Sequence, residues 1–412
     1  MAENSPPSRR SGPTVAVSLI YASNAVQWAS WSLVSVVLPF RFQALGLSVV
    51  DYGVAIAILA FGMLLTEGFW GVLAFRLGNP RTIAVLGLVV AILYAVVGVS
   101  TTFVTLAVSL GLLGAVFIFE VPLMRWMALT ALGPGTGGRG TGLYGLFSGA
   151  GIVAGTSLGP FIFVDYGFAF LIVLVIASYS VGVLLTVFLP WSEVSLPPRQ
   201  PGVARQVRAV FDRPFVMVAM LVILAFTAKS LVWNFLQYYS VSLFQGTTSE
   251  AGFVIGAAQG VSLIAGVVLG ILVDRWGPGR SAPFGFVLLT LGAFGTLFST
   301  SYPEMVGATI LFSAGVGWLS AALLPLALAP VARPLQGTAV GVFGSFEDLG
   351  LLVGPILISA VYASYGVRDI FLLVGGLALG GALLAVLLHR SDRSTPRGAD
   401  GRLTPGGTPL DD

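Results

Sequence analysis

Twelve apolar stretches, each long enough to cross a membrane as a helix, account for most of this 412-residue chain. A helix that spans the hydrocarbon core of a bilayer needs about 20 mostly apolar residues. Such stretches lie near 14–40, 52–75, 82–99, 104–132, 141–164, 168–189, 214–241, 251–273, 282–298, 303–331, 337–362 and 370–388. The pattern predicts an all-α membrane protein with twelve transmembrane helices.

The composition agrees with this prediction. Charged residues make up 9% of the chain and hydrophobic residues 56%, whereas a soluble domain carries roughly 25% charged residues. The chain has no cysteine, and its one histidine, His389, follows the last apolar stretch. A cysteine nucleophile and a thiolate or histidine metal site are therefore excluded. We expect no catalytic residues, no metal, no cofactor and no nucleic-acid partner.

A basic, proline-containing segment separates the stretches into two sets of six. We predict a cytoplasmic tail over 1–13, a six-helix bundle over 14–190, a cytoplasmic linker over 191–213, a second six-helix bundle over 214–388 and a disordered tail over 389–412. The composition of the last segment, polar and rich in Gly and Pro, is typical of disorder.

The arginines predict the direction in which the chain crosses the membrane. If the N-terminus is cytoplasmic, sixteen arginines fall at the cytoplasmic side, and only Arg41 and Arg368 fall outside. An excess of Lys and Arg marks the cytoplasmic side of membrane proteins. We therefore expect both termini in the cytoplasm and a multi-pass protein in the lipid bilayer of the cytoplasmic membrane.

The two predicted bundles resemble each other at an offset of 199 residues (250 − 51). The matching positions are Asp51 and Glu250, Gly53 and Gly252, Gly71 and Gly270, Arg76 and Arg275, Gly78 and Gly277, Arg81 and Arg280, and Gly167 and Gly366. With two small indels, Gly159-Pro160 falls opposite Gly354-Pro355. Duplicated halves around a central pathway are typical of secondary transporters.

One loop in each half resembles the signature of a known family. The second-half loop contains Gly270, Asp274, Arg275, Gly277 and Arg280, and it is similar to the loop between the second and third helices of each half in the major facilitator superfamily. The first-half copy keeps Gly71, Arg76, Gly78 and Arg81 but has Phe75 in place of the acidic residue. The resemblance implies the twelve-helix fold of that family, with N- and C-termini in the cytoplasm, and a gating role for these loops. The loss of the acid at Phe75 assigns more of that role to Asp274.

The fifth stretch has small residues at a spacing of four, Gly151, Gly155 and Gly159-Pro160. This spacing places them on one helix face and predicts close helix packing, with a bend at the proline. The stretch also resembles the fifth-helix motif of drug–proton antiporters within the superfamily. That motif usually has glycines after the proline, where this chain has Phe161-Ile162-Phe163.

Six ionisable side chains fall inside the apolar stretches: Glu67, Glu120, Arg125, Lys229, Glu347 and Asp348. A charge at this depth costs about 2.5–3.5 kcal/mol even on lenient insertion scales, so each is a functional candidate. Lys229, the only lysine, lies near the middle of the seventh stretch. The family resemblance implies that the first, fourth, seventh and tenth helices line the cavity, which includes Glu120, Arg125 and Lys229.

These charges suggest pairs and roles. Glu67 and Arg125 lie at similar depth, and we expect them to form an ion pair; a structural role is favoured for the pair, and a role of Arg125 in substrate binding or coupling is the alternative. Lys229 either holds an anionic group of a substrate or pairs with Glu347 or Asp348, one of which then carries a coupling proton. We also expect Glu120 to take part in proton coupling.

Polar and aromatic residues supply the rest of the expected lining. These are Asn24, Gln27 and Trp31, with Trp28 beside them, in the first stretch; Trp233, Asn234 and Gln237 in the seventh; Gln259 in the eighth; and Trp318 in the tenth. Such a mixture suits a small organic molecule with an apolar body and a few polar groups. Alternatively, the tryptophans pack between helices or lie at headgroup level.

Together these features favour a secondary active transporter that moves a small organic solute by alternating access, coupled to protons. We expect it to act as a monomer. The sequence contains no nucleotide-binding loop, so an ion gradient must drive uphill movement. The alternatives are an exporting drug or metabolite antiporter, a membrane-embedded enzyme and a non-transporting sensor. The sequence offers neither a convincing catalytic set for an enzyme nor a large output domain for a sensor.

Overall fold

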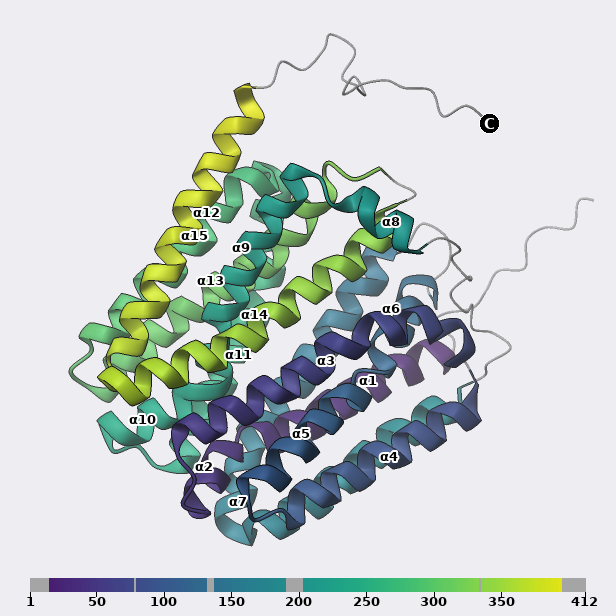
Figure 1. The fold of residues 1–412 in the computed structure, drawn as a ribbon, viewed down its shortest axis with the longest axis vertical. Helices are drawn as coiled ribbons and strands as arrows, with labels where there is room; N and C mark the ends of the chain where they lie inside the picture. Colours follow the sequence, from purple (N-terminus) through teal and green to yellow (C-terminus); the bar gives the residue numbers. More distant parts are fainter. Residues whose placement is uncertain (1–14, 78, 132–136, 190–202, 333–334, 395–412) are drawn as a thin grey trace, which may run out of the picture.

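The computed structural model describes residues 15–77, 79–131, 137–189, 203–332 and 335–394. These residues are almost entirely helical, and none of them forms a strand. The helices build two bundles that lie side by side, the first half in purple and blue and the second in teal to yellow (Figure 1).

The described part of the first bundle contains seven helices. They are α1 (Val15–Ser35), α2 (Leu38–Ala44), α3 (Val49–Leu77), α4 (Pro80–Val99), α5 (Phe103–Phe117), α6 (Glu120–Ala131) and α7 (Gly137–Val187). The first predicted span comprises α1 and α2, and the fourth comprises α5 and α6. α7 holds the fifth and sixth spans, which Gly167 separates with a non-helical φ of 82°.

The second bundle follows a short helix, α8 (Val203–Val210). Its elements are α9 (Arg213–Ser230), the π-helical turn η2 (Leu231–Phe235), α10 (Leu236–Phe244), α11 (Thr248–Trp276), α12 (Pro278–Phe298), α13 (Tyr302–Leu328), α14 (Gln336–Tyr365) and α15 (Asp369–Ser394). α9, η2 and α10 together form the seventh span.

These helices account for the twelve predicted spans. Among the described residues, ten segments are long and apolar enough to cross a membrane, and one of them, Leu143–Val187, contains the two spans on either side of Gly167. α1 is not among the ten because its polar residues lower its hydropathy. Its 21 residues make it about 31 Å long, which is sufficient to cross the hydrocarbon core.

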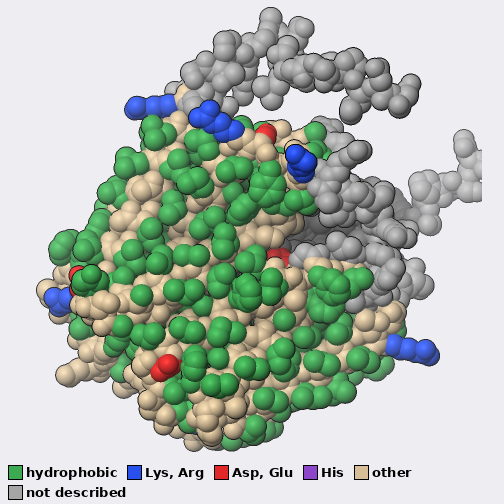
Figure 2. Space-filling view, in the orientation of Figure 1, with side chains coloured by type: hydrophobic (Ala, Val, Ile, Leu, Met, Phe, Trp, Pro, Cys, Tyr) green, Lys and Arg blue, Asp and Glu red, His purple; other side chains and the backbone are tan. Residues whose placement is uncertain are grey.

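The surface fits a lipid environment. Hydrophobic side chains cover the middle of the face in Figure 2, and Lys and Arg side chains lie towards its edges. On α4, exposed side chains include Val85, Leu88 and Ile92. Arg41 and Arg368 lie at the end of the molecule that holds α2 and α10, and the exposed arginines at the opposite end include Arg81, Arg213, Arg275, Arg280 and Arg390. The two sets of arginines are therefore separated by the length of the bundle.

The sequence repeat has structural counterparts at helix starts. Asp51 Oδ2 accepts a hydrogen bond of 2.8 Å from the backbone N–H of Ser48 before α3. Glu250 Oε2 accepts one of 2.7 Å from the backbone N–H of Thr247 before α11. Each carboxylate thus satisfies a backbone donor at the start of its helix. The equivalent acidic residues cap equivalent helices.

The repeat also recurs in the turns after the fifth and eleventh spans. Gly167 and Gly366 have φ of 82° and 101°. Side chains other than glycine rarely adopt such values, because a Cβ atom clashes with the backbone there. Both halves therefore require glycine at this turn.

The halves meet along two seams, between α3 and α14 and between α7 and α11. A Cβ atom on Gly53 of α3 would overlap Ser359 of α14, and one on Gly252 of α11 would overlap Pro160 of α7. Gly53 and Gly252 are equivalent in the repeat, so internal symmetry relates the two seams. Glycine at these positions lets the helix backbones approach closely.

Glycines also bring helices together within each half. Gly151, Gly155 and Gly159 of α7 lie against the backbone of α1, where an added Cβ would overlap. In the second half, Gly350 and Gly354 of α14 lie against α9 in the same way. The close packing that the spacing of four predicts is confirmed.

At the end that holds α2 and α10, the two halves are joined directly. The Tyr238 hydroxyl donates a hydrogen bond of 3.0 Å to the carbonyl of Pro39, a residue 199 positions away. The buried ring of Tyr52 lies with its centroid 5.7 Å from that of Phe235 and 5.8 Å from that of Tyr238. These contacts close this end of the molecule.

Candidate substrate pocket and buried charges

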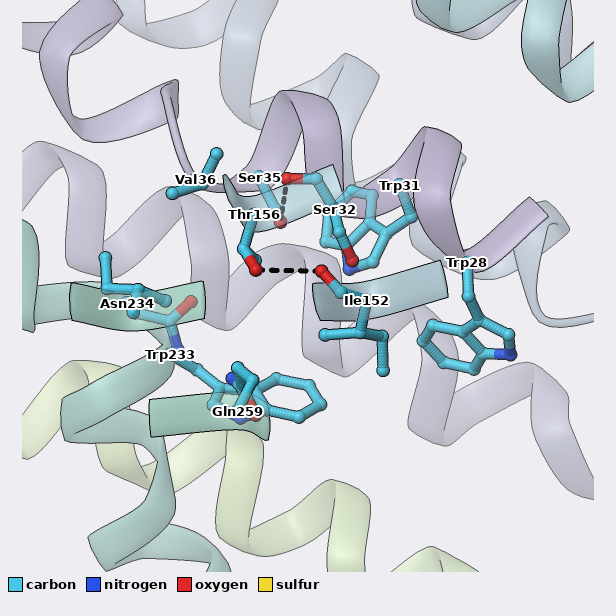
Figure 3. A pocket seen from close by; sticks show the side chains of 11 residues that line it. Trp28, Trp31, Ser32, Ser35, Val36, Ile152, Thr156, Trp233, Asn234 and Gln259 are labelled. Carbon is cyan, nitrogen blue, oxygen red and sulfur yellow. Dashed lines mark hydrogen bonds between the residues drawn. The ribbon is translucent and has the colours of Figure 1, made fainter. Parts of the chain in front are cut away.

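A pocket lies between the two halves, next to the seam of α7 and α11. It contains about 420 Å³ of empty space, including the part that is open to the outside. Its lining consists of Trp28, Trp31, Ser32, Ser35 and Val36 from the first span, Ile152 and Thr156 from the fifth, Trp233 and Asn234 from the seventh, and Ile255 and Gln259 from the eighth. Figure 3 shows these side chains around the pocket. Both halves therefore contribute to one site.

Three tryptophans give the pocket an aromatic character. Trp28 and Trp31 of α1 both pack against Phe117 at the end of α5, with centroid distances of 5.9 and 5.8 Å. Trp233 lies on the second-half side of the pocket, together with Asn234 and Gln259 (Figure 3). Aromatic walls with a few amide and hydroxyl groups suit a small organic molecule.

The π-helical turn η2 presents Trp233 and Asn234. It spans Leu231–Phe235, directly after Lys229 and Ser230 at the end of α9. A π-helical turn contains one residue more than an α-helical turn and so interrupts the regular succession of side chains around the helix; such turns are frequent at functional sites. The first span is interrupted at the equivalent depth, at Val36 and Val37 between α1 and α2. Both interruptions lie next to the pocket.

Lys229 lies beside the pocket on aromatic rings. Its Nζ atom is 4.1 Å from the centroid of the Trp233 ring and 4.6 Å from that of Phe226. A cation within about 6 Å of a ring centroid is attracted by the electrons of the ring face. Glu347 of α14 also interacts electrostatically with this ammonium group. Phe226 and Trp233 are three and four residues from Lys229, the spacing of neighbours on one helix face.

Glu120 is buried in the first half, with 2% of its surface exposed. It lies in the first turn of α6, where the fourth span is interrupted. Pro122 accounts for the interruption, because it has no N–H to donate to the carbonyl of Ile118. The Gln27 Nε2 atom donates a short hydrogen bond to Glu120 Oε2. Oε1 has no hydrogen-bond partner among the described residues.

The surroundings of Glu120 connect it to the aromatic wall. Tyr179 of α7 is fully buried and interacts electrostatically with Glu120. The centroid of the Tyr179 ring lies 6.0 Å from that of the Phe117 ring. The Phe117 ring also packs against Trp28 and Trp31. Phe117 therefore connects the two pocket tryptophans to Tyr179, which is next to Glu120.

A hydrogen-bond network holds the polar face of α1. Gln27 Nε2 donates to Ser23 Oγ at 2.9 Å, and Ser23 Oγ donates to the Gly182 carbonyl at 2.7 Å. Asn24 Nδ2 donates to Ser148 Oγ at 2.6 Å and to the Tyr144 carbonyl at 3.1 Å. These bonds satisfy polar groups that lie at membrane depth, where an unpaired group is costly.

The predicted lining residues separate into two groups. Trp28, Trp31, Trp233, Asn234 and Gln259 line the pocket. Asn24, Gln27 and Gln237 are buried inside their own halves, and Gln237 is 0% exposed. Trp318 does not line the pocket as expected: its ring centroid lies 6.0 Å from that of Trp276 and 6.2 Å from that of Phe284. It packs between helices, the alternative considered for the tryptophans.

The fifth and eighth spans also contribute to the pocket, through Ile152, Thr156 and Ile255. The sequence did not indicate that these three residues line it. No described residue of the fourth or tenth span lines it. Phe226 could have been found from its spacing to Lys229, whereas Tyr179 comes close to Glu120 only through the folded arrangement.

Several predicted residues stay predictions. The side chains of Arg76 and Arg125 lie outside the described part of the structure, and so do the surroundings of Gly71 and the whole of Gly78. The expected pair of Glu67 and Arg125 is therefore untested. Asp348 is buried in α14 next to Glu347. In the second-half loop, Gly277 has a φ of 82°, a conformation that favours glycine. The side chains of Asp274, Arg275 and Arg280 in this loop are exposed.

The fold and the pocket define a class of protein: a membrane carrier built from two similar halves with a binding site between them. The sequence matches the profile of the Major Facilitator Superfamily over residues 20–247 and 218–409. The chain therefore belongs to the Major Facilitator Superfamily and is a membrane transporter. This is a family of transporters rather than enzymes, in agreement with the expectation from the sequence.

Relatives include the multidrug resistance proteins MdtG. The chain is 26% identical over 385 residues to MdtG of Dickeya zeae, with 88% of this chain and 91% of the relative covered. It is 24% identical over 377 residues to MdtG of Klebsiella pneumoniae, with 88% and 90% covered. Nearly the whole length of these proteins is therefore matched.

Solved structures share the fold. A bacterial homologue of the human lysosomal transporter Spinster, in an inward-facing and unoccupied conformation, superimposes with a TM-score of 0.79 at 12% identity, covering 96% of this chain and all (100%) of that one. The nucleoside transporter NupG superimposes with a TM-score of 0.72 at 14% identity, covering 90% and 98%. At this level of identity the similarity concerns the fold.

Proposed function

We propose that this transporter moves a small organic solute across the cytoplasmic membrane by alternating access, coupled to protons. The observation that carries the proposal is the pocket between the halves. Its lining comes from α1 and α7 on one side and from η2 and α11 on the other. The two sides of the lining separate when the halves rock apart. The solute binds between Trp28, Trp31 and Trp233.

The joined end supports a rocking mechanism. Tyr238 and Pro39 hold the halves together at the end of α2 and α10, so access to the pocket lies towards the opposite end. By the distribution of arginines, that opposite end faces the cytoplasm. The transporter then alternates by breaking the contacts of Tyr238 and Tyr52 and closing the other end.

Glu120 is our candidate for the proton-carrying group. One of its oxygen atoms is bonded to Gln27 and the other is without a hydrogen-bond partner among described residues, which leaves a place for a proton. An ionisable group at membrane depth is costly and marks a functional site by default. Lys229 with Glu347 and Asp348 forms a second candidate group in the other half.

The relatives favour export. The proteins that match over 90% or more of their length are named multidrug resistance proteins. An inward-directed proton gradient can drive an organic solute out of the cell only by antiport, in which the solute and the proton occupy the carrier in turn. We therefore propose the exporting antiporter as the direction of transport.

The test begins with a thermal-shift screen of purified protein against anionic, neutral and cationic metabolites and drugs. The compound with the largest shift is then followed in proteoliposomes with an imposed pH gradient. We expect Glu120→Gln to lower gradient-driven accumulation at least about 10-fold and to keep exchange of labelled for unlabelled solute. Glu304→Gln, which removes an exposed acid at the start of α13, is the matched control and should transport normally.

Unchanged accumulation in Glu120→Gln would show that the coupling group lies elsewhere. Binding without flux in any gradient would instead favour the sensor considered from the sequence. Flux driven by a sodium gradient but not by a proton gradient would reject proton coupling and keep the carrier.

A further inference from the structure

The pocket combines aromatic walls with a lysine of the protein itself. Trp233 lines the pocket, and the Lys229 ammonium group lies 4.1 Å from the centroid of its ring. The Phe226 ring is on the same ammonium group at 4.6 Å. An aromatic ring attracts a cation through its electron-rich face, and here the protein's own lysine already uses that attraction.

We infer that this pocket selects flat ring compounds that are uncharged or anionic and disfavours lipophilic cations. The inference deepens the proposed function, since it names the class of solute for the same site. The flat ring stacks among Trp28, Trp31 and Trp233, and hydrogen-bonding groups on its edge meet Asn234 and Gln259.

The described lining of the pocket carries no charge. None of the described residues that line it is acidic or basic, so a cationic solute finds no carboxylate of these residues in contact with it. Glu120 is buried behind α1, where Gln27 holds it. Glu347 interacts with Lys229, and its carboxylate serves that internal cation. The described acids near the pocket are thus engaged by groups of the protein.

Lys229 also repels a cation in the pocket. A cation stacked on the face of the Trp233 ring opposite Lys229 would lie roughly 8 Å from Nζ, the sum of two cation–ring separations of about 4 Å. At an effective dielectric constant of about 20, two like charges at this distance weaken binding roughly 30-fold. Glu347 offsets part of this effect. We therefore expect a discrimination of about 10-fold against a cation, compared with a neutral compound of the same shape.

One short segment carries the lysine, the ring and the amide. The π-helical turn η2 begins two residues after Lys229 and contains both Trp233 and Asn234. The Trp233 ring therefore contacts the lysine and also lines the pocket. Lys229 is not among the lining residues, so we expect its exchange to change the charge and to keep the lining.

Three probes with one ring system test the inference: acridone (neutral), acridine-9-carboxylate (anionic) and 10-methylacridinium (cationic). Binding to the purified full-length protein is measured by tryptophan fluorescence quenching and by equilibrium dialysis. We expect the wild type to bind the first two at least about 10-fold more tightly than 10-methylacridinium. Lys229→Met should remove most of this preference, and Lys229→Arg, which keeps a cation on the ring, should retain it.

Equal affinity of the wild type for all three probes, or a preference for the cation, would overturn the inference. So would binding of none of them. If Lys229→Met does not fold, Lys229→Gln gives the answer, because it also removes the charge beside Trp233; an unchanged preference would contradict the inference. These experiments need no gradient, so selectivity without transport would refute the proposed function alone, and transport of 10-methylacridinium as the preferred solute would refute this inference alone.

Discussion

Gln27 on α1 and Phe226 on α9 occupy equivalent positions, 199 residues apart (226 − 27). Gln27 donates a hydrogen bond to the buried acid Glu120, whereas Phe226 lies under the ammonium group of Lys229. The same helix position thus holds an acid in the first half and a base in the second. The halves therefore share a scaffold and differ in the chemistry that this position supports.

The shared part of the scaffold is the seam, and a substitution there should have the largest effect. Gly53→Val and Gly252→Val would each place atoms where Ser359 or Pro160 now lies. Overpacking of this kind costs about 1–3 kcal/mol, or roughly a 5- to 150-fold change in an equilibrium. We expect both variants to shift the carrier away from the state that is joined at α2 and α10.

The measurement uses the absence of cysteine from the chain. A single Ser35→Cys in the pocket is labelled by a membrane-impermeant maleimide from each side of proteoliposomes, and labelling from the joined side should rise. Gly307→Val is the control, since nothing lies within 4 Å of a Cβ there. If only one of the two seam variants responded, the seams would not be equivalent in mechanism.

The specialised part should respond in different ways in the two halves, with an intermediate effect. Gln27→Leu removes the donor to Glu120, and a hydrogen bond to a charged group contributes about 1.5 kcal/mol or more. We expect gradient-driven transport to fall about 10-fold with an altered pH dependence, while acridone still binds. Phe226→Leu should instead weaken the discrimination against 10-methylacridinium and leave the pH dependence as it is.

Transport measured over a range of pH, together with dialysis of the two probes, separates these effects. If each variant changed both properties equally, the division between an acidic half and a basic half would be wrong.

The smallest effect is expected for two adjacent tyrosines. Tyr238→Phe removes the hydrogen bond to Pro39 in the other half, which contributes about 1 kcal/mol and should shift the Ser35→Cys labelling about 5-fold. Tyr239→Phe removes a bond of 2.8 Å to the Thr296 carbonyl inside the second half. It should lower the melting temperature slightly and leave labelling unchanged; equal labelling changes would contradict the role given to Tyr238.

The fold was largely predictable because apolar length and glycine positions are local signals. The twelve spans follow from hydropathy. Gly167 and Gly366 match in the repeat because both turns have a backbone conformation that only glycine readily adopts. The contact between Gln27 and Glu120 joins residues 93 positions apart and could not be read from spacing. The ring contacts of Lys229 could be predicted from spacing, since Phe226 and Trp233 lie on the same helix face as Lys229.

The lining of the pocket was only partly predictable for a physical reason. Polarity alone does not distinguish a side chain that faces a cavity from one that is satisfied within its own bundle. Asn24 is bonded to Ser148 and the Tyr144 carbonyl, and Trp318 packs against two aromatic rings. Only the neighbours on other helices decide which of the two situations applies.

The bond from Tyr238 to Pro39 has a consequence for assembly. The two residues correspond to each other in the repeat, so they meet as the two copies of one position meet at the axis of a symmetric dimer. Two identical subunits would present the same residue from both sides. The single chain presents a tyrosine from one side and a proline from the other, and it fixes one copy of each half per molecule. Covalent linkage of the halves thus permits an asymmetric interface without permitting the wrong pairs to form.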